Sequence, residues 1–152
     1  MKKPLMILVC IVFVAAALGG AYAQFAKPQD AIKYRQSVMF LIGQHFGRMG
    51  AMVKEQTPYN QQVFRHNAMV VETLSRLPWE AMMTPGTEKG DTRMNAAVFA
   101  KQTEFKEAAQ TFETQADKLV SMAQSNDFAA IKKQFGAVAK SCKACHGQFR
   151  TK

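Results

Sequence analysis

The chain has 152 residues, enough for one domain with its own core, and hydrophobic residues make up 48% of it. Its formal net charge is +9, which falls by two if Lys2 and Lys3 are removed with an N-terminal segment. The other basic residues are scattered, with no run of five like charges. The charge therefore favours acidic partners in general and gives no indication of a nucleic-acid-binding surface.

Residues 1–23 have the pattern of a secretory signal peptide. Two lysines supply the positive start, Leu5–Leu18 form an apolar stretch, and Ala21–Ala23 is a small-residue cleavage site. The apolar stretch is shorter than the roughly 20 residues that span a bilayer. The sequence predicts a cleaved signal, a mature domain over residues 24–152, export to the periplasm, and no membrane anchor.

Four segments carry apolar residues at alternating spacings of three and four, which is typical of one face of an α-helix. We expect them over about 27–54, 60–77, 92–123 and 127–149, with one longer Pro-, Gly- and Thr-rich loop before the third. Strand-like alternation is absent. Four amphipathic helices with short connections predict an all-α fold, an antiparallel four-helix bundle.

The predicted helix boundaries rest on capping residues. Pro28 suits the first turn of the first helix. Asp91 or Thr92 is expected to cap the third helix, and Asn126 or Asp127 the fourth.

The apolar stripes predict which helix faces form the core. In the first helix Arg35 lies within the stripe, between Ile32 and Met39. The expected stripe of the second helix is Val63, Asn67, Val70, Leu74 and Leu77. The stripe of the third helix is Val98, Phe105, Ala108, Phe112, Ala116, Leu119 and Ala123. The stripe of the last helix is Phe128, Ile131, Phe135, Val138, Cys142, Cys145 and Phe149.

Residues 142–146 read Cys-Lys-Ala-Cys-His, the pattern of covalent c-type haem attachment. Two thiols three positions apart can each reach a vinyl group, and the following histidine can ligate the iron. The alternatives are a disulfide, a thioredoxin-like redox pair or half of a zinc site. No βαβ pattern or second cysteine pair supports them, and His45 and His66 are the only other histidines. Both lie off the main apolar stripes, so we expect surface or interface positions for them.

A haem motif on the last helix of such a bundle resembles the cytochrome c prime family. The resemblance covers essentially the whole mature chain and rests on Lys33–Ser37, His45–Met49, Leu77–Trp79, Pro85–Glu88, Ser141–His146 and Arg150. It implies one haem c, with thioether bonds to Cys142 and Cys145 and His146 as the axial iron ligand. It also implies a five-coordinate, high-spin iron that binds nitric oxide and carbon monoxide, and a homodimer formed through the first two helices.

The resemblance extends to the proximal side and the haem edge. It implies that Arg150 lies beside the imidazole, although a cation here also suits the helix dipole. It places Arg35 and Gln36 at the haem edge. A buried Arg35 needs an anion, such as a propionate; the alternative is a partly exposed arginine with a buried stem. Asp91 and Thr92 are expected to offer backbone N–H groups to the other propionate, or to act as caps alone.

Met39 decides between two functions. It lies one turn after Arg35 and is expected to face the distal side of the haem, with Trp79 and Met82 completing the distal or edge packing. A Met39 that only packs leaves a gas-binding five-coordinate haem that can also transfer electrons. A Met39 that ligates through sulfur gives a six-coordinate, low-spin electron carrier. Enzyme activity is not expected, because the distal stripe lacks acid–base groups.

Overall fold

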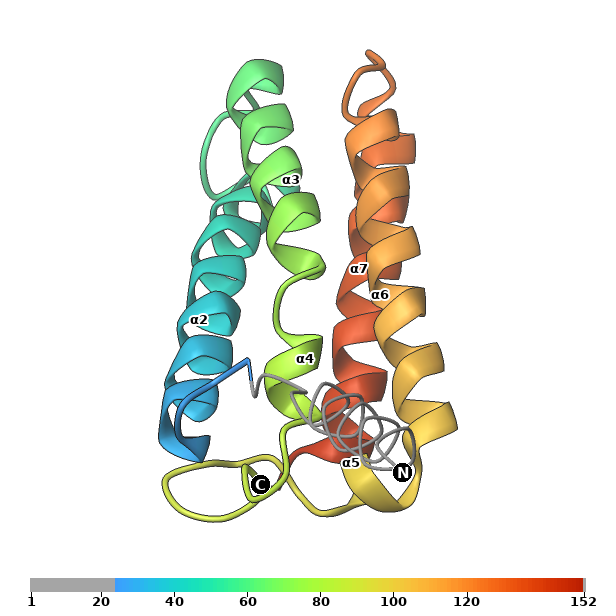
Figure 1. The fold of residues 1–152 in the computed structure, drawn as a ribbon. Helices are drawn as coiled ribbons and strands as arrows, with labels where there is room; N and C mark the ends of the chain where they lie inside the picture. The colour runs from blue at the N-terminus through green and yellow to red at the C-terminus, as the bar shows by residue number, and fades with distance from the viewer. Residues whose placement is uncertain (1–23, 152) are drawn as a thin grey trace, which may run out of the picture.

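Four long helices run alternately up and down in the computed structural model, which describes residues 24–151 (Figure 1). They are α2 (Pro28–Val53), α3 (Gln61–Ser75), α6 (Gln102–Met122) and α7 (Phe128–Phe149), and two short helices, α4 (Trp79–Met82) and α5 (Ala97–Ala100), lie between α3 and α6. The predicted antiparallel four-helix bundle is confirmed. The predicted signal peptide, residues 1–23, lies outside the described residues.

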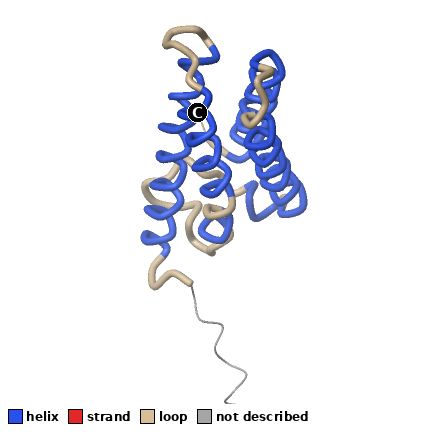
Figure 2. The backbone as a smooth tube through the Cα atoms, turned by 90° about the horizontal axis from the view of Figure 1, so that it is seen from above, coloured by secondary structure: helices blue, strands red, loops and turns tan. Residues whose placement is uncertain are grey.

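Within the described range the chain consists of helices and loops without a strand (Figure 2). An isolated antiparallel bridge joins Met94 to Arg150. None of the described helices is both long and apolar enough to cross a membrane.

Two of the predicted helix starts are confirmed. Pro28 is the first residue of α2. The carboxylate of Asp127 accepts a hydrogen bond from the Ala130 N–H at 2.9 Å and so caps α7. Pro28 suits a helix start because its φ angle is already fixed near the helical value. Asp127 suits one because its carboxylate accepts from a backbone N–H that has no partner within the helix.

The predicted start of the third helix is wrong. Asp91 and Thr92 lie in the loop, α5 begins only at Ala97, and α6 begins at Gln102. The reason is long-range hydrogen bonding. The Thr92 hydroxyl accepts from Arg35 and the Asp91 carbonyl accepts from Gln36, so both residues are held against α2 rather than at a helix terminus.

The main core confirms three of the four apolar stripes. It joins buried side chains from all four long helices, and the rings of Phe46 and Phe135 stack within it at 4.1 Å. The stripe of the second helix is wrong at its two ends, since Val63 is 44% and Leu77 38% exposed, whereas Asn67 is buried and Leu74 packs on the core as predicted. The buried face of α3 is Phe64, Asn67, Ala68, Val71 and Ser75. Packing against both α2 and α6 selects this face, which carries the fully buried ring of Phe64.

A second apolar cluster closes the end of the bundle where α7 ends. Its buried members are Val98, Phe105 and Phe149, and the rings of the last two meet edge to face at 5.2 Å. The side chains of Trp79, Met82, Met83 and Met94 pack around it. This cluster and the main core meet at the part of α7 that carries the two cysteines.

Candidate functional site

The last two turns of α7 carry the predicted haem-attachment residues. Cys142 and Cys145 are half-buried free thiols, three residues apart, and His146 follows directly. Spacings of three and four put all three side chains on one helix face. Cys142 packs against the main core and Cys145 against the second cluster. The thiols therefore lie where the two apolar clusters meet.

Both thiols stay protonated at neutral pH. Burial raises the pKa of the Cys142 thiol to about 11, and the nearby Cys145 adds to the shift. Burial also raises the pKa of Cys145. A redox dithiol requires an accessible thiolate, which this buried environment disfavours. Among the described residues, no group of three or more His, Cys, Asp or Glu side chains gathers as a metal site.

The His146 imidazole stays neutral at neutral pH. Its ring is exposed to solvent, yet desolvation by the surrounding protein lowers its pKa, and the positive charges of Arg150 and Arg93 lower it further. A neutral imidazole has a free nitrogen lone pair for a metal. Arg150 thus lies close enough for its charge to act on His146, as predicted, whereas Arg93, 53 positions away in the chain, was not predicted to lie near it.

A backbone clasp fixes the end of α7. The Thr151 N–H donates to the Arg93 carbonyl at 2.8 Å, and the Asn95 N–H donates to the Phe149 carbonyl at 3.1 Å. Together with the Met94–Arg150 bridge, these bonds hold residues 93–95 along the last turn of α7. We call this set of main-chain bonds the C-terminal clasp. It positions the turn that carries His146.

Arg35 is buried and holds the long loop onto α2. It is 3% exposed and donates to the Thr87 carbonyl at 2.5 Å, and to the Thr92 hydroxyl at 2.6 Å. A longer bond of 3.3 Å reaches the Ala81 carbonyl. The alternative of a partly exposed arginine is therefore wrong, because loop carbonyls surround the guanidinium. Burial lowers its pKa, and the negative charge of Glu88 partly offsets this.

The predicted haem-edge residues lie together. Beside Arg35, the Gln36 amide donates to the Asp91 carbonyl at 2.9 Å. One carboxylate oxygen of Glu88 is buried here without a hydrogen-bond partner. A buried polar atom without a partner is rare in a native fold, so this edge has the polar capacity to meet a further hydrogen-bonding group.

The predicted distal residues approach the same region from α2 and α4. Met39 is half-buried against the main core. Trp79 borders both clusters, and its indole N–H donates to Glu113 at 2.5 Å. Met82 packs on the second cluster. Glu113 was not predicted to lie here, because Trp79, its partner, is 34 positions away in the chain.

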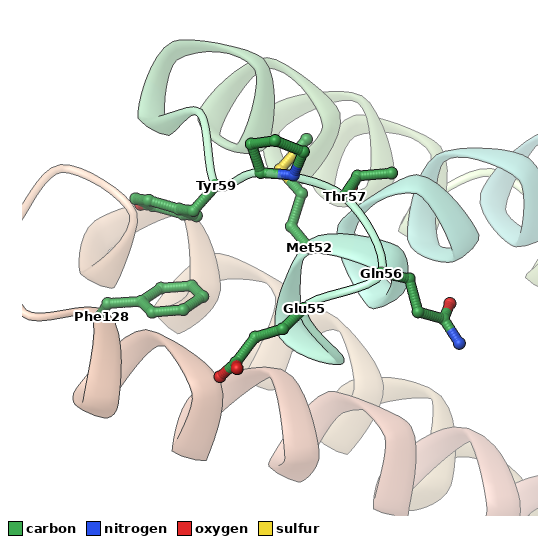
Figure 3. A pocket seen from close by; sticks show the side chains of 7 residues that line it. Met52, Glu55, Gln56, Thr57, Tyr59 and Phe128 are labelled. Carbon is green, nitrogen blue, oxygen red and sulfur yellow. The ribbon is translucent and has the colours of Figure 1, made fainter.

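A surface pocket of about 290 Å³ lies at the other end of the bundle, where α2 gives way to α3 (Figure 3). Met52, Tyr59 and Phe128 form its apolar part, and Glu55 and Gln56 its polar rim. It contains none of the predicted site residues, and its size is at the lower limit for small-molecule pockets, about 300 Å³.

The residues present fit a c-type haem. Two half-buried thiols and a neutral imidazole lie on the last turns of α7, apolar side chains of both clusters adjoin them, and Arg35 brings a positive charge to the predicted haem edge. A helical bundle with this site defines a haem-binding protein of the c type.

Comparisons with known proteins agree with this class. The family profile of cytochrome c′ matches residues 30–150. Cytochrome c′ of Alcaligenes xylosoxydans is 45% identical over 129 residues, covering 85% of this chain and 99% of the relative. That of Rubrivivax gelatinosus is 44% identical over 130 residues, covering 85% of this chain and all of the relative.

Solved structures give the same result. Cytochrome c prime from Shewanella frigidimarina superposes with a TM-score of 0.82 at 37% identity, covering 85% of this chain and all of that one. A nitric oxide complex of a mutant cytochrome c prime from Alcaligenes xylosoxidans has a TM-score of 0.78 at 44% identity, covering 85% and 99%. The chain belongs to the cytochrome c′ family, a family of haem proteins.

Proposed function

We propose that this chain is a periplasmic mono-haem cytochrome c′ that captures nitric oxide and carbon monoxide on a five-coordinate iron. One haem c is linked through thioethers to Cys142 and Cys145, with His146 as its axial ligand. The haem supplies an open iron position for a gas and a centre for one-electron transfer. Electron transfer is accessory, and no enzymatic turnover is proposed.

The observation that carries the proposal is the placement of the three α7 residues. Cys142 and Cys145 are half-buried free thiols, three positions apart, where the two apolar clusters meet, and His146 follows directly. Addition of each S–H across a vinyl group would form the two thioethers. The neutral His146 can donate a lone pair without first losing a proton.

Whether the iron would be five- or six-coordinate depends on Met39. The packing of its side chain supports the five-coordinate form. The Met39 side chain is half-buried and packs against the main core, so the thioether already has apolar partners. An apolar lid next to the iron admits small uncharged gases and offers no acid–base group. Six-coordinate ligation by Met39 remains the second candidate, because this thioether comes from the helix that faces the site.

The haem edge is proposed to bind the propionates. Arg35 and Gln36 supply cationic and amide donors, and Asp91 and Thr92 supply nearby polar groups. Because Arg35 already donates to loop carbonyls, it both secures the loop and provides positive charge at the edge.

A homodimer through α2 and α3 is part of the proposal. Phe40 and Leu41 on α2 and Val63 and Met69 on α3 are large apolar side chains left exposed. Phe40→Glu is expected to give monomers in sedimentation velocity, whereas the control Met122→Glu, on exposed α6 surface, leaves dimers intact. Monomeric wild-type protein would contradict the dimer alone.

The function is tested on protein exported with a c-type haem maturation system. Wild type should keep its colour through acid–acetone extraction, and Cys142→Ser with Cys145→Ser should lose it. Lys143→Ala, an exposed change between the cysteines, is the matched control and should retain the haem.

Spectra then separate the two functions. The five-coordinate form shows no methionine-sulfur band at the red end, and nitric oxide binds without displacing a protein ligand. A red-end band that Met39→Ala abolishes would establish the six-coordinate carrier and refute the gas-capture proposal.

A further inference from the structure

The outward face of α7 carries lysines next to the haem-attachment residues. The helix has 22 residues, and it holds four lysines but neither aspartate nor glutamate. Lys133, Lys140 and Lys143 are exposed, and their spacings of seven and three put them on one face of the helix. At a rise of about 1.5 Å per residue, they extend over about 15 Å of its length. We call these three residues the α7 lysine face.

The protein does not neutralise these three charges. None of the ion pairs in the described part of the chain includes them. The fourth lysine, Lys132, differs, since it pairs with Glu55 and lies 4.8 Å from the centre of the Phe128 ring. The positive potential of the α7 lysine face is therefore available to a negative charge from outside the chain.

The neighbouring edge of α6 adds no net negative charge to this surface. Gln134 of α7 donates to Gln115 of α6 at 2.9 Å, which identifies the edge of α6 that lies beside α7. At three–four spacing along this edge the charged residues are one acid, Glu104, and one base, Lys118. Their charges cancel, so the lysines of α7 set the sign of the surface.

The neighbouring edge of α2 is uncharged. Phe46 of α2 stacks on Phe135 of α7 and so identifies that edge. The other residues at three–four spacing along it are Gln36, Met39, Gly43 and Gly50. No carboxylate on either neighbouring edge therefore offsets the α7 lysine face as a whole.

The proposed homodimer leaves this face open. The dimer forms through α2 and α3, whereas α7 packs against α6 and α2 (Figure 1). The two histidines that we expected at surface or interface positions belong to the dimer side, on α2 and α3. His66 is exposed, and His45 is half-buried with Asn67 2.8 Å from its Nδ1.

We propose that the α7 lysine face docks an acidic protein that exchanges electrons with the haem, an inference that rests on the haem attachment proposed above. Lys143 lies between Cys142 and Cys145, so a protein bound to this face is next to the haem site. Complementary charges speed the encounter and fix its orientation. Redox encounters need only small interfaces, under about 1,200 Å².

Stopped-flow reduction of the haem-loaded ferric protein by flavodoxin, a small acidic flavoprotein, tests the proposal. The anionic flavin hydroquinone gives one electron to the ferric iron and becomes the neutral semiquinone, with no proton transferred. Lys140→Gln with Lys143→Gln should slow this reaction roughly fivefold or more at about 20 mM ionic strength, and the difference should disappear at about 0.5 M salt.

Lys54→Gln with Lys106→Gln is the matched control. It removes the same charge from exposed positions outside α7 and should slow the reaction less than about twofold. Equal slowing by the two pairs would mean that only net charge matters and would overturn the proposal.

A bilayer with anionic lipids is the other negative surface that could meet these lysines. Lys140→Gln with Lys143→Gln could abolish co-sedimentation with phosphatidylglycerol vesicles yet leave the flavodoxin rate unchanged. That result would assign the face to a membrane and overturn the proposal. Wild-type protein without haem would overturn the proposed function as well, whereas equal slowing by the two lysine pairs leaves nitric oxide capture intact.

Discussion

Replacing Arg35 with alanine is expected to lower the free energy of unfolding by about 3–4 kcal/mol. Two short bonds from the guanidinium, to the Thr87 carbonyl and the Thr92 hydroxyl, would be lost. Hydrogen bonds to charged groups are each worth about 1.5–3 kcal/mol. The loss should stay in the lower part of the range for two such bonds. After the substitution the half-buried Thr92 hydroxyl can bond to water, whereas the buried Thr87 carbonyl cannot.

Urea unfolding of the haem-loaded protein, followed by far-ultraviolet circular dichroism, measures this loss. Gln36→Ala is the matched control, since its single bond of 2.9 Å reaches the same loop from an exposed position. It should cost about 1 kcal/mol or less. If Arg35→Ala and Gln36→Ala lower stability equally, the buried arginine does not hold the loop and the reasoning is refuted.

Three further predictions concern the bundle itself. Asp127→Ala should cost about 1 kcal/mol in thermal unfolding through loss of the α7 cap, and Asn126→Ala, which caps nothing, should cost almost none. Phe105→Ala removes a ring that is 1% exposed and should cost about 3–5 kcal/mol in urea unfolding; a loss under about 1 kcal/mol would contradict its place in the second cluster. The hydrogen bond and charge of Lys132 lower the pKa of Glu55, so its stabilisation is present above the ordinary glutamate pKa and is lost as pH falls through the lower folded value. Between about pH 5 and pH 3, wild type should therefore lose more stability than Glu55→Gln, and parallel losses would show that the ion pair contributes nothing.

The sequence predicted what depends on local order. Helical spacing predicted the four long helices, and Pro28 and Asp127 predicted where α2 and α7 begin. The Cys-x-x-Cys-His run placed the candidate ligands on α7. These features depend on residues within a few positions of each other. The stripe of α3 failed because several faces of that helix carry apolar side chains, and packing against two neighbours chose the face with Phe64.

The parts that were not predicted depend on partners far apart in the chain. Arg35 required an oxygen acceptor, but nothing in its spacing indicated that loop carbonyls about 50 positions away would supply it. The loop at Asp91 and Thr92 has the composition of a helix cap, yet its polar groups bond to α2. The charge of Arg93 reaches His146 only because the C-terminal clasp brings both to one place.

The C-terminal clasp differs from a side-chain contact in its response to substitution. Because peptide groups make its hydrogen bonds, these bonds remain when the side chains at residues 93–95 and 151 change, although the side chains of Arg93, Asn95 and Thr151 add hydrogen bonds across the same contact. Proline is the exception, since it has no N–H to donate at Asn95 or Thr151. Substitutions here other than proline should therefore leave the main-chain bonds that hold the turn carrying His146, whereas a salt bridge is lost with either of its side chains.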